Sequence, residues 1–132
     1  MFHDITLIIV SYDSYELIKK NLPIISKFKS VIVENSTSNK IETLVNKIDN
    51  IKYIKSKKNL GYGLGNNLGV KESETSFVLI LSPDIMIDEN SIKILYNKYF
   101  KYENVGIIAP SLYEENKIRR SNGNISHLKK NK

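Results

Sequence analysis

The chain has 132 residues, enough for one domain with a buried core. Its composition, 41% hydrophobic and 26% charged, is ordinary for a globular protein and argues against wholesale disorder. The absence of cysteine excludes a disulfide framework and thiolate metal sites. The longest apolar runs, Ile5–Val10 and Phe77–Leu81, are too short to span a bilayer, and no basic segment of a secretory signal precedes them. We therefore expect a cytoplasmic protein, free or peripheral at the inner membrane face.

The net charge of +6 comes mainly from lysine. A basic protein attracts nucleic acid, an anionic membrane surface or a phosphorylated small ligand. The lysines are scattered along the chain and no recognised nucleic-acid motif occurs, so nucleic acid is the weakest of these three candidates.

Strands and helices are predicted to alternate from the start of the chain. Ile5–Ser11 is a continuous apolar run rich in β-branched residues, as expected for a buried parallel strand. Asp13 is predicted to cap the following helix, with Glu16 completing a capping box, and Pro23 to end or kink it. Ser30–Asn35 reads as the second strand.

The same alternation continues through the middle of the chain. Ile51–Lys55 is predicted as a short third strand and Phe77–Leu81 as a buried fourth strand. Between them, a glycine-rich helix follows the loop Ser56–Leu60 and runs to about Glu74. A helix is also predicted from Asn39, because apolar residues fall on one face at Ile41, Leu44, Val45 and Ile48.

The last third of the chain carries weaker signals. Asp88 is predicted to cap a further helix, Val105–Ala109 to form a fifth strand, and Ser111–Ile118 is a candidate sixth. We expect one domain over residues 1–118 and a polar, poorly ordered tail over residues 119–132.

This alternation predicts an α/β fold, a three-layer sandwich with a mostly parallel central sheet. Ligands of such sheets bind beyond the carboxyl ends of the strands. The polar residues that follow the predicted strands should meet at that edge: Ser11, Tyr12, Asp13, Glu34, Asn35, Asn59 and Asp84.

Two strand ends offer groups suited to a nucleotide. After the first strand, the ring of Tyr12 could stack on a base and the hydroxyl of Ser11 could bond to base or ribose, although a helix cap beside a packing tyrosine is the favoured interpretation of this segment taken alone. After the second strand, Glu34 could accept hydrogen bonds from base or ribose, whereas Asn35 and Ser36 favour an ordinary turn.

The segment Asn59–Gly69 is the most informative. Its glycines at positions 61, 63, 65 and 69 are too dense for an ordinary helix, where each costs up to roughly 1 kcal/mol relative to alanine. Gly65 and Gly69 share one helical face and allow close backbone approach, and a glycine-rich helix start offers free N–H groups to an anion. Helix–sheet packing explains these two glycines but leaves Asn59, Asn66 and Asn67 unexplained, which favours a binding function.

A fourth segment, Ser82-Pro83-Asp84, follows the last buried strand. A carboxylate held by a proline-restricted turn at a strand end suits a hard divalent cation, and a simple turn cap is the alternative.

Taken in order, these segments resemble the N-terminal half of family 2 glycosyltransferases, which have the GT-A fold. The likeness covers nearly the whole chain and is nearest to the rhamnosyltransferase-like branch, where Asn-Pro-Asp commonly replaces the acidic Asp-x-Asp motif. The matching pieces are IIVSYDS (8–14), VIVENSTS (31–38), NLGYGLGNNLG (59–69), FVLILSPDI (77–85) and VGIIAPSLYEENKIRRSNG (105–123).

The resemblance implies a set of residue roles. Asp84 matches the last acid of Asp-x-Asp and would hold Mg²⁺ or Mn²⁺ at a weak site, because Ser82 replaces the first acid. Glu34 stands where the family usually has Asp for the base or ribose, and Asn66 where the wider family often has Arg. The implied nucleotide-sugar contacts are Ser11, Tyr12, Glu34, Asn59, Gly61, Asn66, Asn67 and Asp84.

The family reaction transfers a sugar from a dTDP- or UDP-type donor to a hydroxyl of a glycan or lipid-linked acceptor, with inversion. In the family, the catalytic base and the acceptor-binding elements follow the segment that this chain resembles, so we expect donor binding without transfer by these 132 residues alone. The alternative is a noncatalytic nucleotide-binding α/β domain or a truncated remnant.

Overall fold

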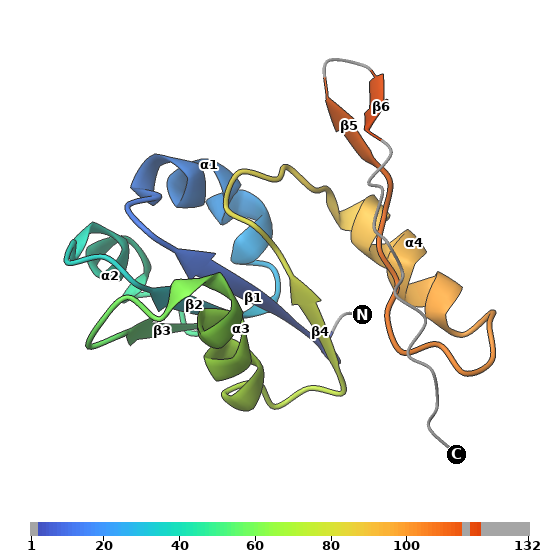
Figure 1. Cartoon of the computed structure of the whole chain (residues 1–132), viewed down its shortest axis with the longest axis horizontal. Helices are drawn as coiled ribbons and strands as arrows, with labels where there is room; N and C mark the ends of the chain where they lie inside the picture. Colours follow the sequence, from blue (N-terminus) through green and yellow to red (C-terminus); the bar gives the residue numbers. More distant parts are fainter. Residues whose placement is uncertain (1–2, 115–116, 120–132) are drawn as a thin grey trace. The chain divides into compact units, whose positions relative to one another are not determined.

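The computed structural model describes residues 3–114 and 117–119. The chain divides into two compact units, Met1–Glu89 and Asn90–Lys132. The first unit holds strands β1 (Ile5–Ser11), β2 (Lys29–Glu34), β3 (Ile51–Lys55) and β4 (Phe77–Ile80), with helices α1 (Tyr15–Ile25), α2 (Lys40–Val45) and α3 (Gly61–Lys71) (Figure 1). From the unit boundary onward follow helix α4 (Glu89–Tyr99) and strands β5 (Leu112–Glu114) and β6 (Lys117–Arg119).

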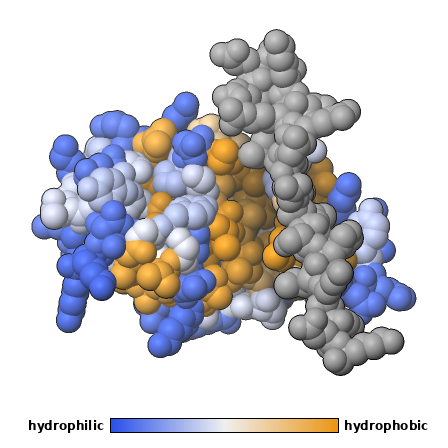
Figure 2. Space-filling model, in the orientation of Figure 1, coloured by the Kyte–Doolittle hydropathy of each residue, from blue (hydrophilic) through white to orange (hydrophobic). Residues whose placement is uncertain are grey.

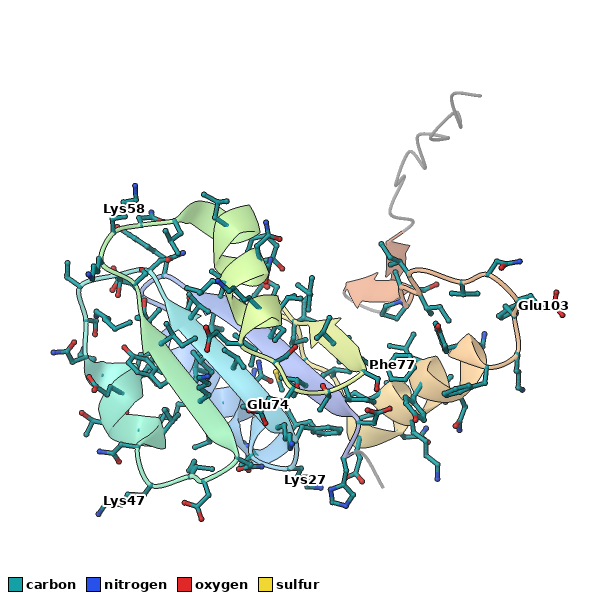
Figure 3. The ribbon with its side chains drawn as sticks, turned by 90° about the horizontal axis from the view of Figure 1, so that it is seen from below. Lys27, Lys47, Lys58, Glu74, Phe77 and Glu103 are labelled. Atoms are coloured by element: carbon teal, nitrogen blue, oxygen red, sulfur yellow. The ribbon has the colours of Figure 1, made fainter. Side chains whose placement is uncertain are left out.

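The four strands of the first unit form one parallel sheet in the order β3-β2-β1-β4. Strand β1 is central, and all seven of its residues are buried because it is paired on both sides and covered on both faces. Ile8 lies opposite Val31 of β2 and Ile80 of β4. Helix α3 covers one face of the sheet, and α1 and α2 cover the other (Figures 1 and 3). The predicted three-layer α/β sandwich is therefore confirmed, with an all-parallel sheet.

Helix α3 lies very close to β1, and glycine makes this possible. A Cβ on Gly65 would come within 2.8 Å of Val10 Cγ1, and one on Gly69 would overlap Ile8 Cγ2. Ile8 and Val10 belong to a buried cluster with Val31 and Val33 on this face. The close approach inferred from the glycine spacing is confirmed.

Helix α1 begins differently from the expectation. Asp13 adopts a left-handed conformation, with φ of 51°, and Ser14 occupies the N-cap position without a side-chain hydrogen bond to the helix. The predicted Asp13 cap and its capping box with Glu16 are wrong, because a residue with positive φ lies outside the geometry of an N-cap. Pro23 does not end the helix, which continues to Ile25.

Strand β4 forms one edge of the sheet, and exposed and partly buried side chains alternate along it. Val78 and Ile80 are exposed, whereas Phe77 and Leu79 are partly buried. Figure 2 shows apolar surface on this face of the first unit. Leu64 and Val70 of α3 are also exposed.

In the second unit, the structure differs from the prediction for the last two strands. Residues 105–111 form no strand, and the side chain of Ile107 is 91% exposed. Strand propensity alone does not make a strand when no neighbouring strand pairs with the segment. The candidate strand Ser111–Ile118 is instead a short antiparallel pair, with Tyr113 opposite Ile118.

Two further expectations concern the domain boundary near residue 118 and membrane-spanning segments. The expected tail lies outside the described residues except for Arg119, which ends β6, so the boundary at residue 118 stays a prediction. Within the described part of the chain, no helix is long and apolar enough to cross a membrane.

We expect Gly69→Ala to lower the free energy of unfolding by about 1–3 kcal/mol, the usual cost of overpacking, because the new methyl group would overlap Ile8. Gly63→Ala is the matched control: it lies in the same helix, nothing lies within 4 Å of its Cβ position, and alanine should raise stability by up to about 1 kcal/mol. Urea denaturation of both variants measures the difference. Equal effects of the two substitutions would contradict the close-packing account.

Candidate functional site at the carboxyl edge of the sheet

The strand order reverses direction beside β1. The chain runs from β1 to β2 and β3 on one side, and then crosses through α3 to place β4 on the other side. In doubly wound sheets, the crevice at the carboxyl ends of the two strands flanking such a switch point is the usual ligand site. Leu81 N–H donates to the carbonyl oxygen of Ile8 at 2.9 Å, so the turn that carries Asp84 starts directly beside β1. The switch point therefore brings together the segment after β1 and the segment after β4.

Tyr12 is the exposed aromatic residue that follows β1. Its side chain is 59% exposed, and its carbonyl oxygen accepts a hydrogen bond from Ser14 Oγ at 3.1 Å. Its backbone is thus fixed while its ring is available at the surface. This arrangement is compatible with stacking on a flat ligand.

Glu34 and Ser11 form a buried pair across the ends of β1 and β2. Ser11 Oγ donates to Glu34 Oε2 at 2.9 Å, and the backbone N–H of Ser36 donates to Glu34 Oε1 at 2.7 Å. Neither Ser11 nor Glu34 has exposed surface. The sequence correctly placed these two residues together, and in this conformation their polar atoms bond to the protein itself.

Tyr53 of β3 lies near this pair and is affected by it. Its hydroxyl oxygen is buried and has no hydrogen-bond partner among the described residues. Burial raises the pKa of Tyr53 to about 12, and the negative charges of Glu34 and Glu42 add to the shift. The phenol is therefore held in its neutral form.

Asn35 holds the loop that leads into α3. Its Nδ2 donates to the carbonyl oxygen of Gly61 at 3.2 Å, and its Oδ1 accepts from Ser56 Oγ at 2.9 Å and from Leu60 N–H at 3.4 Å. The sequence marked Asn35 as a strand-end polar residue but assigned no role to Ser56. The structure makes Asn35 the link between the end of β2 and the glycine-rich helix.

The asparagines of the glycine segment have separate environments. Asn59 Oδ1 accepts the N–H of Gly61 at 2.8 Å, and Gly61 has a left-handed φ of 72°, which favours glycine. Asn66 is only 7% exposed, and its Oδ1 has no partner among the described residues, whereas Asn67 is exposed. Consecutive helical residues point about 100° apart, so only one of this pair can face the sheet.

Asp84 sits in a short turn after β4, with its side chain exposed. Ser82 Oγ donates to Asp84 Oδ1 at 2.5 Å, and Ile85 N–H donates to the carbonyl oxygen of Ser82 at 3.1 Å. Among residues 3–114 and 117–119, no three His, Cys, Asp or Glu side chains gather to hold a metal ion. A cation at this turn would have one protein carboxylate and would need its other ligands from a bound molecule.

The opposite edge of the sheet has a different character. Figure 3 shows Lys58, which follows β3, and Lys47, which precedes it, at opposite ends of that strand. At the amino-terminal edge lies an open groove whose lining includes Lys29, Lys52 and Glu72. Lys52 Nζ bonds to Glu72 Oε2 at 2.6 Å, which raises the pKa of Lys52 and lowers that of Glu72. The residues that line this groove include both members of the Lys52–Glu72 ion pair and residues at the strand ends.

This topology and these strand-end groups define a doubly wound α/β domain with its polar site at the switch point. The chain belongs to the family described as Glycosyl transferase family 2, which residues 6–131 match. It is 37% identical over 117 residues to the "Low-salt glycan biosynthesis hexosyltransferase Agl10" of Haloferax volcanii, covering 85% of this chain and 38% of that protein. The resemblance to family 2 glycosyltransferases is therefore confirmed.

The fold is also found among solved structures. The crystal structure of S. aureus TarS 1-349 superposes with a TM-score of 0.64 at 20% identity, over 85% of this chain and 40% of that chain. This likeness establishes the GT-A-like fold. The chain spans roughly two fifths of the length of both relatives.

The buried hydroxyl of Tyr53 yields a prediction on pH. Because the pKa is raised in the folded protein from 10.0 to about 12, the unfolded chain loses this proton first as pH rises. Stability supplied by the neutral phenol is complete below about pH 10 and is lost as pH rises toward 12. Tyr53→Phe should therefore show a shallower fall in stability between these values than the unchanged protein. Urea denaturation at a series of pH values measures it, and identical slopes would contradict the assigned pKa.

Proposed function

We propose that this domain binds a nucleotide-diphosphate sugar, linked to dTDP or UDP, beyond the carboxyl ends of β1 and β4. The observation that supports the proposal is that Tyr12 follows β1 and the Asp84 turn follows β4, the strand paired with β1 across the topological switch point of a family 2 glycosyltransferase fold. In the complete enzyme, the sugar would pass to a hydroxyl of a glycan or lipid-linked acceptor. The name of the archaeal relative, which describes glycan biosynthesis, supports this direction.

Three features suit the nucleotide. The exposed ring of Tyr12 can stack on a base, and Ser11 is the last residue of the strand that Tyr12 follows. The buried Oδ1 of Asn66 lacks a donor among the described residues, and a ligand hydroxyl or N–H would supply the missing hydrogen bond. Glu34 then contributes either directly, if Ser11 rotates away, or by holding the ends of β1 and β2 together.

Asp84 is the proposed metal ligand. Mg²⁺ in phosphate-binding sites is commonly held by one or two carboxylates together with substrate phosphates, so a single carboxylate fits this use. When bound, Mg²⁺ or Mn²⁺ would act as a Lewis acid that stabilises the departing diphosphate. Asp84 would place it, and Ser82 would orient the carboxylate through its hydrogen bond.

The described carboxylates at this edge leave the base for the acceptor unassigned. Glu34 is buried and bonded on both oxygens, Asp84 has the metal role, and Asp13 is exposed in the turn after β1 without an assigned role. We therefore propose that these residues serve donor binding. A cytoplasmic location belongs to the same proposal and is supported by the absence of cysteine.

We expect UDP or dTDP to bind more tightly with Mn²⁺ than without it, and Asp84→Ala to abolish the difference while leaving thermal stability nearly unchanged. The side chain is exposed and contributes little to the core, but it would supply the protein's carboxylate to the cation. Isothermal titration calorimetry with and without Mn²⁺ measures the effect.

Asp49→Ala is the matched control, because this aspartate lines the groove at the opposite edge of the sheet. It should leave the Mn²⁺ effect intact. Nucleotide affinity that is the same with and without Mn²⁺ in the unchanged protein would reject Asp84 as a metal ligand.

A further inference from the structure

Asn21 is a buried polar residue in the apolar face of α1. It is 2% exposed and shares that buried face with Ile18 and Ile25. An amide at such a position costs free energy unless it makes hydrogen bonds. The hydrogen-bond partners of Asn21 should therefore explain why a polar residue occupies this buried position.

Those partners flank Asp84. Asn21 Nδ2 donates to the carbonyl oxygen of Pro83 at 2.9 Å and to that of Ile85 at 3.3 Å. One NH₂ group thus holds the backbone on both sides of the proposed metal ligand. Among the described residues, Asn21 Oδ1 has no hydrogen-bond partner, so the side chain serves here as a donor.

The turn has little else to fix it to the rest of the fold. The ladder between β4 and β1 ends with the bond from Leu81 N–H to Ile8. The bonds from Ser82 to Asp84 and from Ile85 to Ser82 lie within the turn and shape it without anchoring it. In the described residues, Asn21 supplies the long-range hydrogen bonds that reach residues 83–85.

We propose that Asn21 is a positioning residue for the donor site: it holds the Pro83–Ile85 turn so that the Asp84 carboxylate stays beyond the carboxyl ends of β1 and β4. The proposal rests on the proposed function for the role of Asp84. The anchoring itself is independent of any ligand, and the two parts can be tested separately.

The chain provides a matched control in Asn50. Its Nδ2 donates to the carbonyl oxygens of Ser26 and Phe28 at 2.5 and 2.9 Å, the same double-carbonyl arrangement. Asn50 precedes β3 and lies at the amino-terminal edge of the sheet. Its replacement removes two comparable bonds far from Asp84.

The experiment compares Asn21→Leu, Asn21→Ser and Asn50→Leu with the unchanged chain. Leucine is similar in size and cannot donate, and serine keeps one donor in case the leucine variant does not fold. The first readout is amide hydrogen exchange of Ile85, measured by NMR. The second is the Mn²⁺-dependent part of UDP affinity, measured by calorimetry at a temperature where every variant is folded.

We expect Asn21→Leu to speed exchange of the Ile85 amide roughly fivefold or more, the factor set by loss of one buried hydrogen bond. The gain in UDP affinity caused by Mn²⁺ should fall by a similar factor, with an intermediate effect for Asn21→Ser. Asn50→Leu should change neither readout, although it lowers overall stability.

Unchanged exchange at Ile85 in the Asn21 variants would overturn the anchoring. Faster exchange with an unchanged Mn²⁺ effect would overturn the positioning role. If the unchanged protein binds no UDP in the presence of Mn²⁺, the proposed function fails, and the exchange measurement still decides whether Asn21 anchors the turn.

Discussion

The close contact between helix α3 and strand β1 is the constraint on which the site depends. Gly65 and Gly69 bring the helix backbone against Val10 and Ile8, at a distance that any side chain would prevent. Asn35, which follows β2, donates a hydrogen bond to the carbonyl oxygen of Gly61 at the start of this helix. The same contact buries Asn66 against the sheet. The glycines therefore act on the site through packing, because they set the distance between α3 and the sheet.

The polar residues at the carboxyl edge divide into two groups. Glu34, Asn35 and Asn21 are buried, and their hydrogen bonds join separate segments of the chain. Tyr12 and Asp84 are exposed, and their side chains face solvent. Buried polar groups with satisfied donors fix a conformation, which is what a site needs before its exposed groups can bind a ligand with little loss of entropy. The first group thus provides a rigid frame for the second.

The sequence predicted the four strands of the sheet, and the central strand β1 is a continuous apolar run buried on both faces, as such runs predict. The expected burial of Phe77–Leu81 was wrong for Val78 and Ile80, because β4 lies at an edge of the sheet. Local signals were less reliable. The Asp13 cap failed because the backbone at this residue is left-handed, and the strand at Val105–Ala109 failed because pairing, which a single segment does not encode, is absent there.

The sequence predicted where the site residues lie better than it predicted the contacts that they make. Glu34 and Ser11 were placed at the same edge, but their mutual hydrogen bond depends on side-chain geometry. Asn21 was missed although a signal existed: it falls three residues after Ile18 and four before Ile25, on the stripe that should be apolar. A polar residue on such a stripe indicates a buried hydrogen bond, but the sequence does not say to which segment.

The strand order also sets the sequence of events in folding. β1 pairs with β2 through neighbours such as Thr6 and Lys29, whereas its other edge pairs with β4, where Ile5 meets Phe77. Contacts that close longer loops form more slowly, so β1 acquires its second partner late. During synthesis, the fully buried central strand of the sheet therefore keeps one open edge until α3 and β4 have left the ribosome. That interval is when the nascent chain is most exposed to aggregation, and the position of β4 in the sequence determines how long it lasts.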